Sequence, residues 1–456
     1  MAGIGFELRR LLADERKFGV FRAYAYAGLI SSGPWILSIL GVMAIGVVTR
    51  MLGAPDGEVI DFLVSITYLV ACSLILSGGL QLMYTRFTAD RLFEKRRDKI
   101  LPNLLGSLLL ISVLAAIIAG ASLYYLFHES MMYEVLMFTG FVILCNLWIV
   151  VVFLNGMKEY RAILWAFFVG YGSSLIISLV LMDYGTNGLL FGFVSGQALL
   201  VFMLLWLIIR DYPSRKLLEF EFLNRKKCFY SLAVTGILLN MGIWADKFIF
   251  WFNPVTSEAV IGPLRASFIY DFPIFLAYLS IIPGMAVFLV RMETDFVEQY
   301  DYFYNAVRSG STLEKIMYYR DGMVLTVRQG IAEIFKVQGM TILLAMLFGP
   351  ALLKMFGISL LYIPLLNIDL IGVALQVLFM ALINVLFYLD KRIMAAWLCG
   401  LFFVGNVLLT LLSQWLGPLF YGYGFALALL LACTCAVLAI SRCFERLEYE
   451  TFMLKN

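Results

Sequence analysis

The chain has 456 residues, of which 62% are hydrophobic and 14% charged. A soluble domain carries about 25% charged and about 45 to 50% apolar residues, so this composition excludes a water-soluble protein and favours one helical membrane bundle. The net charge of +3 is uninformative as a total, because the position of each charge matters more in a membrane protein.

Apolar stretches long enough to cross a bilayer occur twelve times. A bilayer core about 30 Å thick needs about 20 consecutive apolar residues in a helix. The predicted spans are residues 24–48, 62–84, 103–127, 133–154, 162–182, 186–209, 229–252, 270–290, 337–358, 365–389, 393–416 and 420–441. Residues 4–22 predict a short amphipathic helix on the membrane surface. Within the ninth span, Gly349-Pro350 predicts an interruption.

Basic residues divide unevenly between alternate connections. Of the 34 lysines and arginines, 30 fall in the two termini and in the connections that share their side. Only Arg50, Arg265 and Lys354 fall on the opposite side, and Lys247 lies inside the seventh span. The positive-inside rule therefore places both termini in the cytoplasm. We expect a bacterial inner-membrane protein surrounded by membrane lipid.

A basic segment divides the spans into two sets of six. We predict an all-α polytopic fold with residues 1–209 as an amphipathic helix plus six spans, 210–228 as a basic cytoplasmic linker, and 229–456 as a second six-helix half. Within that half, residues 291–336 form a cytoplasmic loop with apolar residues at helical spacing, which predicts an amphipathic helix that runs into the ninth span.

Two charges inside a span are the main candidates for a functional site. A charge in a membrane helix costs about 2.5 to 3.5 kcal/mol, and the seventh span holds both Asp246 and Lys247. Adjacent helical residues point about 100° apart, so we expect an ion pair to another helix or a polar cavity rather than an intrahelical pair. Asp271 opens the eighth span and is a further candidate. Asp61 and Asp369 are expected to be interfacial helix caps.

Aromatic and polar residues in mid-span are candidates for a translocation path. Trp35 is preceded by Ser31 and Ser32, and Trp244 is preceded by Asn240. Indole rings can stack on sugar rings while the polar groups bind hydroxyls. The alternative is that these tryptophans pack in the core or face lipid.

Glycines and prolines predict sites of bending and of close helix packing. Gly33-Pro34 and Pro283-Gly284 interrupt the first and eighth spans, where they form either hinges or static kinks. A second pattern, small residues four apart on the sixth span, predicts close helix packing at Gly188, Gly192 and Gly196.

The sequence lacks the motifs of an enzyme. It has no GxxxxGK[ST] phosphate loop and no zinc motif, and its only histidine, His128, is isolated. We therefore expect no enzymatic activity, metal, cofactor or nucleic-acid partner. Twelve spans without a catalytic constellation indicate movement of a solute.

Several long blocks carry a family resemblance. They are MAGIGFELRRLL, AYAGLISSGPWILSILG, IWADKFIFWF, YDFPIFLAYLSIIPGMAVF and RMETDFVEQYDYFYNA. They resemble the family of Pel exopolysaccharide transporters, in the polysaccharide-transport branch of the multidrug/oligosaccharidyl-lipid/polysaccharide (MOP) exporter superfamily. The resemblance implies two six-helix halves with helices 1 and 7 lining a central cavity. It also implies export of an N-acetylgalactosamine-rich biofilm polymer, coupled to synthesis, in a complex with PelD, PelE and the cytosolic glycosyltransferase PelF.

Other functions stay open at this point. The same scaffold could flip a lipid-linked oligosaccharide or work as an ion-coupled antiporter, and the energy source could be protons, sodium or polymer synthesis. A protein of another class, a membrane scaffold that recruits a cytosolic glycosyltransferase, is a further alternative. The exporter hypothesis predicts that alanine at Asp246 or Lys247 stops secretion while the protein still accumulates in the membrane.

Overall fold

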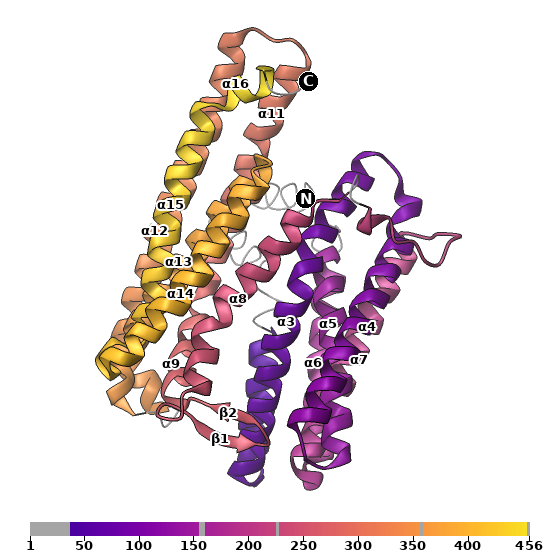
Figure 1. Cartoon of the computed structure of the whole chain (residues 1–456), viewed down its shortest axis with the longest axis vertical. Helices are drawn as coiled ribbons and strands as arrows, with labels where there is room; N and C mark the ends of the chain where they lie inside the picture. The colour runs from indigo at the N-terminus through magenta and orange to yellow at the C-terminus, as the bar shows by residue number, and fades with distance from the viewer. Residues whose placement is uncertain (1–36, 155–159, 225–227, 356–358, 454–456) are drawn as a thin grey trace, which may run out of the picture. The chain divides into compact units, whose positions relative to one another are not determined.

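The computed structural model describes residues 37–154, 160–224, 228–355 and 359–453 and is dominated by long helices (Figure 1). The described chain forms two compact units. Within the described residues, unit 1 comprises Ala245–Ile249 and the chain from Phe268 onward, whereas unit 2 comprises the chain from residue 37 to Trp244 together with Phe250–Ser267. The predicted amphipathic helix at residues 4–22 lies outside the described residues.

Unit 2 is built from membrane-length helices and one small hairpin. Its described elements are a helix at Leu37–Met51, α3 (Asp56–Phe93), α4 (Ile100–Leu126), α5 (Met131–Leu154), α6 (Tyr160–Val180), α7 (Gly185–Asp211), most of α8 (Tyr230–Phe252), β1 (Glu258–Ile261) and β2 (Leu264–Ala266). Short 3-10 helices connect them at Arg97–Lys99, Met182–Tyr184 and Glu221–Leu223. The two strands are antiparallel and pack against α3.

Unit 1 contains the remaining helices. They are α9 (Phe268–Leu279), α10 (Ile281–Val290), the π-helix η4 (Arg291–Phe296), α11 (Val297–Arg308), α12 (Leu313–Met355), α13 (Ile363–Tyr388), α14 (Arg392–Leu416), α15 (Tyr423–Glu445) and α16 (Leu447–Met453). Short 3-10 helices lie at Leu360–Tyr362 and Pro418–Phe420. Helices α12, α13, α14 and α15 run side by side along the unit (Figure 1).

The observed helices confirm an all-α polytopic membrane fold. In the described part of the chain, 10 helices are long and apolar enough to cross a membrane. A pair of helices, Phe268–Leu279 and Ile281–Arg308, is bent by 40°, and the count is 11 if this pair is one broken span. The helix at Leu37–Met51 is the described part of the first predicted span. The bend falls at Ser280, and Pro283 lies in the first turn of α10, where its missing N–H costs no helical hydrogen bond.

Helix α12 differs from the prediction for the ninth span. It runs without a break from Leu313 to Met355, through Pro350. Only five residues follow this proline, so its missing hydrogen bond affects the last turns of the helix alone. The predicted loop at 291–336 is helical as well: η4, α11 and the first half of α12 form a helical hairpin that extends α10 and leads into the ninth span.

Glycines on α7 bring this helix close to α6. A Cβ atom at Gly192 would lie 2.3 Å from Ser178 Oγ, and one at Gly196 would lie 2.0 Å from Ser174 Oγ. At Gly188 the nearest atom would be the Leu181 carbonyl oxygen, at 1.9 Å. All three distances are far below van der Waals contact, so the small-residue pattern of the sixth span is a packing surface, as the spacing predicts.

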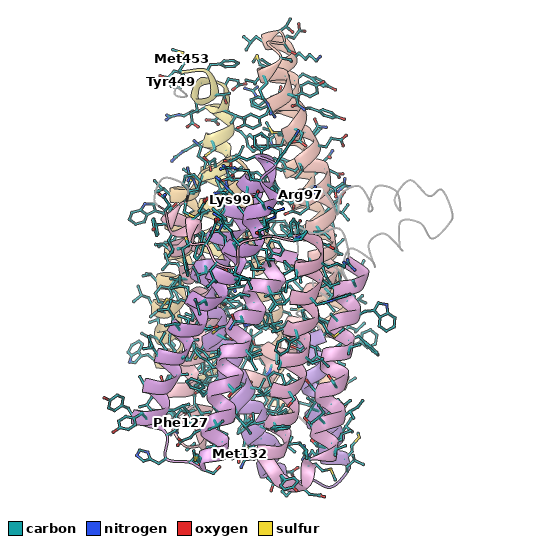
Figure 2. All side chains as sticks on the ribbon, turned by 90° about the vertical axis from the view of Figure 1, so that its right-hand side faces the viewer. Arg97, Lys99, Phe127, Met132, Tyr449 and Met453 are labelled. Atoms are coloured by element: carbon teal, nitrogen blue, oxygen red, sulfur yellow. The ribbon has the colours of Figure 1, made fainter. Side chains whose placement is uncertain are left out.

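Within each unit, the connections that are predicted to lie on the same side of the membrane are found at the same end of the helices. In unit 2, Arg97 and Lys99 lie at one end and Phe127 and Met132 at the other (Figure 2), and Lys99 forms an ion pair with Glu221 of the α7–α8 connection. In unit 1, ion pairs from Lys391 to Glu450 and from Arg320 to Glu448 join the α13–α14 connection and the α11–α12 hairpin to the C-terminal helix α16. This agrees with the assignment of alternate connections to opposite sides.

The compact units do not divide at residues 210–228. Most of α8 belongs to unit 2, because Gly236 of α8 packs directly on the backbone of α3 at Gly78. Only Ala245–Ile249 of α8 belongs to unit 1. The six-and-six division of the sequence therefore stays a prediction, and α8 contributes residues to both units.

Candidate functional site

The two intramembrane charges lie together in the α8 segment that belongs to unit 1. Asp246 is 0% exposed and Lys247 4% exposed. The Lys247 ammonium donates to both carboxylate oxygens of Asp246, at 2.9 and 3.2 Å. The expectation that these neighbours do not pair within the helix is therefore wrong. The long flexible stem of lysine lets the ammonium turn back across the 100° step between adjacent residues.

Two further helices hold the Asp246 carboxylate. The Tyr270 hydroxyl on α9 donates to Oδ2 at 2.5 Å, and the Asn406 amide on α14 donates to Oδ1 at 3.1 Å. One turn further along α14, the Thr410 hydroxyl donates to Asn406 Oδ1 at 2.9 Å and orients the amide. Asp246 thus accepts hydrogen bonds from groups on α8, α9 and α14. A buried carboxylate needs such partners, because otherwise its desolvation is not compensated.

Aromatic side chains surround the Lys247 ammonium. It lies 4.8 Å from the ring centroid of Phe425 on α15 and 5.2 Å from that of Tyr278 on α9. The Tyr278 hydroxyl is 3.4 Å from the ammonium nitrogen. The faces of aromatic rings are electronegative and attract a cation, most strongly where water is excluded. The ammonium therefore gains electrostatic stabilisation from α9 and α15 in addition to Asp246.

A second carboxylate, Asp369 on α13, belongs to the same cluster. It is 0% exposed, and neither of its oxygens has a hydrogen-bond partner among the described residues. It lies within electrostatic reach of Asp246 and Lys247. A Cβ atom at Gly422, whose φ is +84°, would lie 2.9 Å from Asp369 Oδ1. Glycine at this position therefore fits both the left-handed backbone and the space beside the carboxylate.

The expectation that Asp369 is an interfacial cap is wrong. Helix α13 begins at Ile363, so Asp369 is in its second turn, where backbone N–H groups already bond within the helix. Sequence reasoning also missed Tyr270 and Asn406 as parts of the site. Tyr270 directly precedes the predicted candidate Asp271, which is only half-buried in the structure.

Four other predicted site residues, within the described part of the chain, have contacts elsewhere. Trp244 packs on Trp251 in unit 2, with ring centroids 6.2 Å apart. Asn240 donates to the Gly236 carbonyl of its own helix, also in unit 2. Pro283 and Gly284 lie on α10, where Gly284 contacts Gln338 of α12. The remaining candidates lie outside the described residues: Ser31, Ser32, Gly33, Pro34 and Trp35.

The cluster has the chemistry of a buried ionic network. Among the described residues, no group of three or more histidine, cysteine or acidic side chains is placed to hold a metal ion. What the geometry offers is one lysine, two carboxylates and two tyrosines in a protein interior, on α8, α9 and α13. Ionisable groups at such depth are costly and occur mainly where solutes or ions are moved.

Known structures share this arrangement of helices. An outward-facing multidrug resistance MATE family transporter of the MOP superfamily matches with a TM-score of 0.67 and 13% identity, over 98% of this chain and 99% of that chain. A MOP superfamily transporter from Pyrococcus furiosus matches with a TM-score of 0.66 and 13% identity, over 98% and 99% of the two chains. A MATE structure in the bent conformation has a TM-score of 0.65 and 13% identity, over 96% and 98%. The fold is therefore that of MOP superfamily membrane transporters.

The family follows from the sequence comparison. Residues 1–452 match the family model described as "PelG: Putative exopolysaccharide Exporter (EPS-E)". The chain belongs to this PelG family of exopolysaccharide exporters. No curated protein matches the sequence.

Proposed function

We propose that the protein moves Pel exopolysaccharide from the cytoplasm to the periplasm across the bacterial inner membrane. The match to the exopolysaccharide exporter family over residues 1–452 carries this proposal, and the MOP transporter fold supports it. The polymer is rich in N-acetylgalactosamine and contributes to a biofilm matrix. The uneven distribution of lysine and arginine supports cytoplasmic termini.

Export coupled to synthesis requires partners on the cytoplasmic side. We propose that the chain works in a complex with PelD and PelE and receives the polymer from the glycosyltransferase PelF. Within the chain, the Asp246–Lys247 cluster sets the position of the α8 segment in unit 1 through α9 and α14. Because α8 contributes to both units, a change in this cluster acts on a helix that they share.

Inverted membrane vesicles test the export function directly. Vesicles with the protein, PelD, PelE and PelF are supplied with nucleotide sugar on the outside, which corresponds to the cytoplasm. We expect labelled polymer to enter the lumen and become protected from an added glycosidase, whereas vesicles without this chain leave all polymer digestible. Polymer that stays digestible in the complete system contradicts the proposal. Protection of a lipid-linked sugar without PelF would instead identify a flippase, and uptake of a cationic dye alone an antiporter.

If the chain were mainly a scaffold, the cytoplasmic α11–α12 hairpin would be the part that receives the glycosyltransferase. A deletion of residues 311–336 is unsuitable as a test of this alternative, because these residues continue directly into the membrane part of α12. Exposed side chains offer a milder change: Tyr318 and Leu325 are 72% and 56% exposed on α12. If scaffolding were the main task, a Tyr318→Ser/Leu325→Ser variant would lose secretion and regain it when PelF is tethered to the membrane.

We expect such tethering to leave export by an Asp246→Asn variant at background, because translocation itself is then impaired. Secreted polymer is measured in both variants with and without the tether. The control for the Tyr318→Ser/Leu325→Ser variant is Leu419→Ser, which changes an exposed leucine in the short helix before α15 and should secrete polymer like wild type. Rescue of the Asp246 variant by tethering contradicts an exporter and favours a scaffold.

A further inference from the structure

The connection between α7 and α8 turns its acidic side chains towards the protein. Glu221 forms an ion pair with Lys99, and its backbone N–H donates to Asn103 Oδ1 at 2.8 Å. The Asn103 amide donates to Glu219 Oε2 at 3.5 Å, and the Glu219 backbone N–H donates to the Pro102 carbonyl oxygen at 3.1 Å. Only 14% of the Glu219 side chain and 21% of the Glu221 side chain are exposed. Both carboxylates are therefore held against the start of α4.

The same connection turns most of its apolar side chains outwards. Leu217 is 77% exposed, Leu218 50% and Phe220 45%. Phe222, in contrast, is buried and packs on Tyr84, with ring centroids 6.0 Å apart. A connection in water shows the opposite arrangement, because exposing apolar surface to water is unfavourable. Carboxylates turned inwards and leucines turned outwards therefore indicate apolar surroundings.

The exposed apolar side chains lie at the depth of the membrane boundary. A Cβ atom at Gly106 of α4 would lie 2.2 Å from the Glu219 carbonyl oxygen and 3.3 Å from the Phe220 ring, so the connection is level with Gly106. Tyr124 and Tyr125 are exposed near the other end of α4, as expected of an interfacial aromatic belt. Gly106 and Tyr124 are about 27 Å apart along the helix, close to the hydrocarbon thickness of about 30 Å. The connection therefore lies where the acyl chains begin.

The end of α7 gives the same depth. Trp206 is exposed on this helix, and the Arg210 guanidinium lies 5.6 Å from its ring centroid. An exposed tryptophan with an arginine one turn further along is typical of a helix that leaves the hydrocarbon core. Arg210 is two residues before Tyr212, which follows the last residue of α7. The connection thus starts at the boundary as well as lying along it.

Basic side chains flank the apolar ones. Lys216 is exposed directly before Leu217, and the α3–α4 connection adds Lys95, Arg96 and Arg97, which are all exposed. Arg97 is within electrostatic reach of Tyr212 and lies at the same end of unit 2 as Lys99 (Figure 2). The two connections are therefore neighbours. Clusters of lysine and arginine beside a membrane helix attract anionic lipid headgroups.

We propose that the α7–α8 connection is inserted into the cytoplasmic leaflet and forms, with Lys95 and Arg97, a binding site for an anionic phospholipid. Leu217, Leu218 and Phe220 contact the acyl chains, and the basic side chains bind the phosphate of the headgroup. A lipid suits this surface better than a cytosolic protein, because the apolar side chains lie level with the membrane part of α4. The site concerns how unit 2 is held in the membrane and does not depend on the cargo.

Spin-label accessibility in liposomes tests the insertion. A nitroxide is attached to Leu217→Cys in the full-length protein, and labelled wild type provides the background from the native cysteines. Collisions with oxygen, which concentrates in lipid, are compared with collisions with a water-soluble nickel chelate. We expect the ratio to match that of Ile117→Cys, an exposed position in the membrane part of α4, and to exceed that of Tyr318→Cys on the α11–α12 hairpin several-fold. A ratio equal to that of Tyr318→Cys overturns the insertion and favours a cytosolic partner.

Native mass spectrometry of the purified protein tests the headgroup site. Equal amounts of phosphatidylglycerol and phosphatidylcholine are offered in detergent. Lys95→Gln/Arg97→Gln should lower the ratio of bound phosphatidylglycerol to bound phosphatidylcholine about tenfold, equivalent to about 1.4 kcal/mol. The matched control is Lys315→Gln/Arg328→Gln, which removes two exposed charges from α12 and should bind lipid like wild type.

Two results would overturn the lipid site. An unchanged ratio in the Lys95/Arg97 variant excludes these side chains as its headgroup ligands. Displacement of phosphatidylglycerol by an equal concentration of inorganic phosphate shows that the site takes a free anion and not a lipid. Because no polymer is present in either experiment, none of these outcomes depends on the vesicle assay of export.

Discussion

Replacement of Asp246 by asparagine is expected to abolish polymer export and to destabilise unit 1. The Lys247 ammonium is 4% exposed and loses its hydrogen-bonded carboxylate in this variant. Removing one partner of a buried ion pair costs about 3 to 5 kcal/mol, because the remaining charge stays desolvated. The Asp246 carboxylate also accepts hydrogen bonds from Tyr270 and Asn406, so its replacement changes how α8 is held against α9 and α14. We therefore expect polymer export to be lost.

The loss of charge balance and the loss of a functional carboxylate can be separated with a double variant. Asp246→Asn combined with Lys247→Met removes both charges, so we expect thermal unfolding in detergent to return close to that of wild type while secreted polymer stays at background. Both variants should still accumulate in the membrane, because they make α8 more apolar. Export restored in the double variant would show that the pair only holds the fold together.

Replacement of Gly236 by leucine is expected to have the largest effect on the fold of unit 2. A Cβ atom at Gly236 would lie 2.0 Å from the backbone carbonyl oxygen of Gly78 on α3. Since this neighbour is main chain and not a flexible side chain, the two helices must separate. Overpacking typically costs about 1 to 3 kcal/mol and more where the backbone must move, so we place this variant at or above the upper end of that range.

Gly172→Leu is the matched control for this prediction. Gly172 lies on α6 of the same unit, and no atom lies within 4 Å of a Cβ placed there. Thermal unfolding in detergent and the yield of monodisperse protein should be reduced in the Gly236 variant and close to wild type in the control. Equal stability of the two variants would contradict the tight contact between α3 and α8.

The structure gives different contacts to residues that lie close together in the sequence. Gly236 and Trp244 are both on α8, yet Gly236 packs against α3 and Trp244 packs on Trp251. Asp271 and Tyr270 are adjacent, and Tyr270, which the sequence did not single out, donates to Asp246. Position along a helix therefore does not identify which side chain reaches a site, because neighbouring residues point in directions about 100° apart.

The features that could be predicted from the sequence are those that follow from the residues of a single helix. Hydropathy over about 20 residues indicates each span, and the cost of a charge in a membrane singles out Asp246 and Lys247. Four-residue spacing of small residues predicted the packing surface at Gly188, Gly192 and Gly196, and the structure shows the contacts. Each of these signals is contained in one helix, so no knowledge of its neighbours is needed.

The class of fold and the two charges that must be compensated follow from the amino-acid sequence alone. What compensates the charges depends on how the helices pack: the Lys247 side chain turns back on Asp246, Asp369 is buried beside the pair, and Asn406 donates to Asp246 from 160 residues away. The physical reason is that lipid tails are as apolar as the protein interior. The faces of membrane helices therefore carry little hydrophobic pattern to indicate which neighbour each face meets.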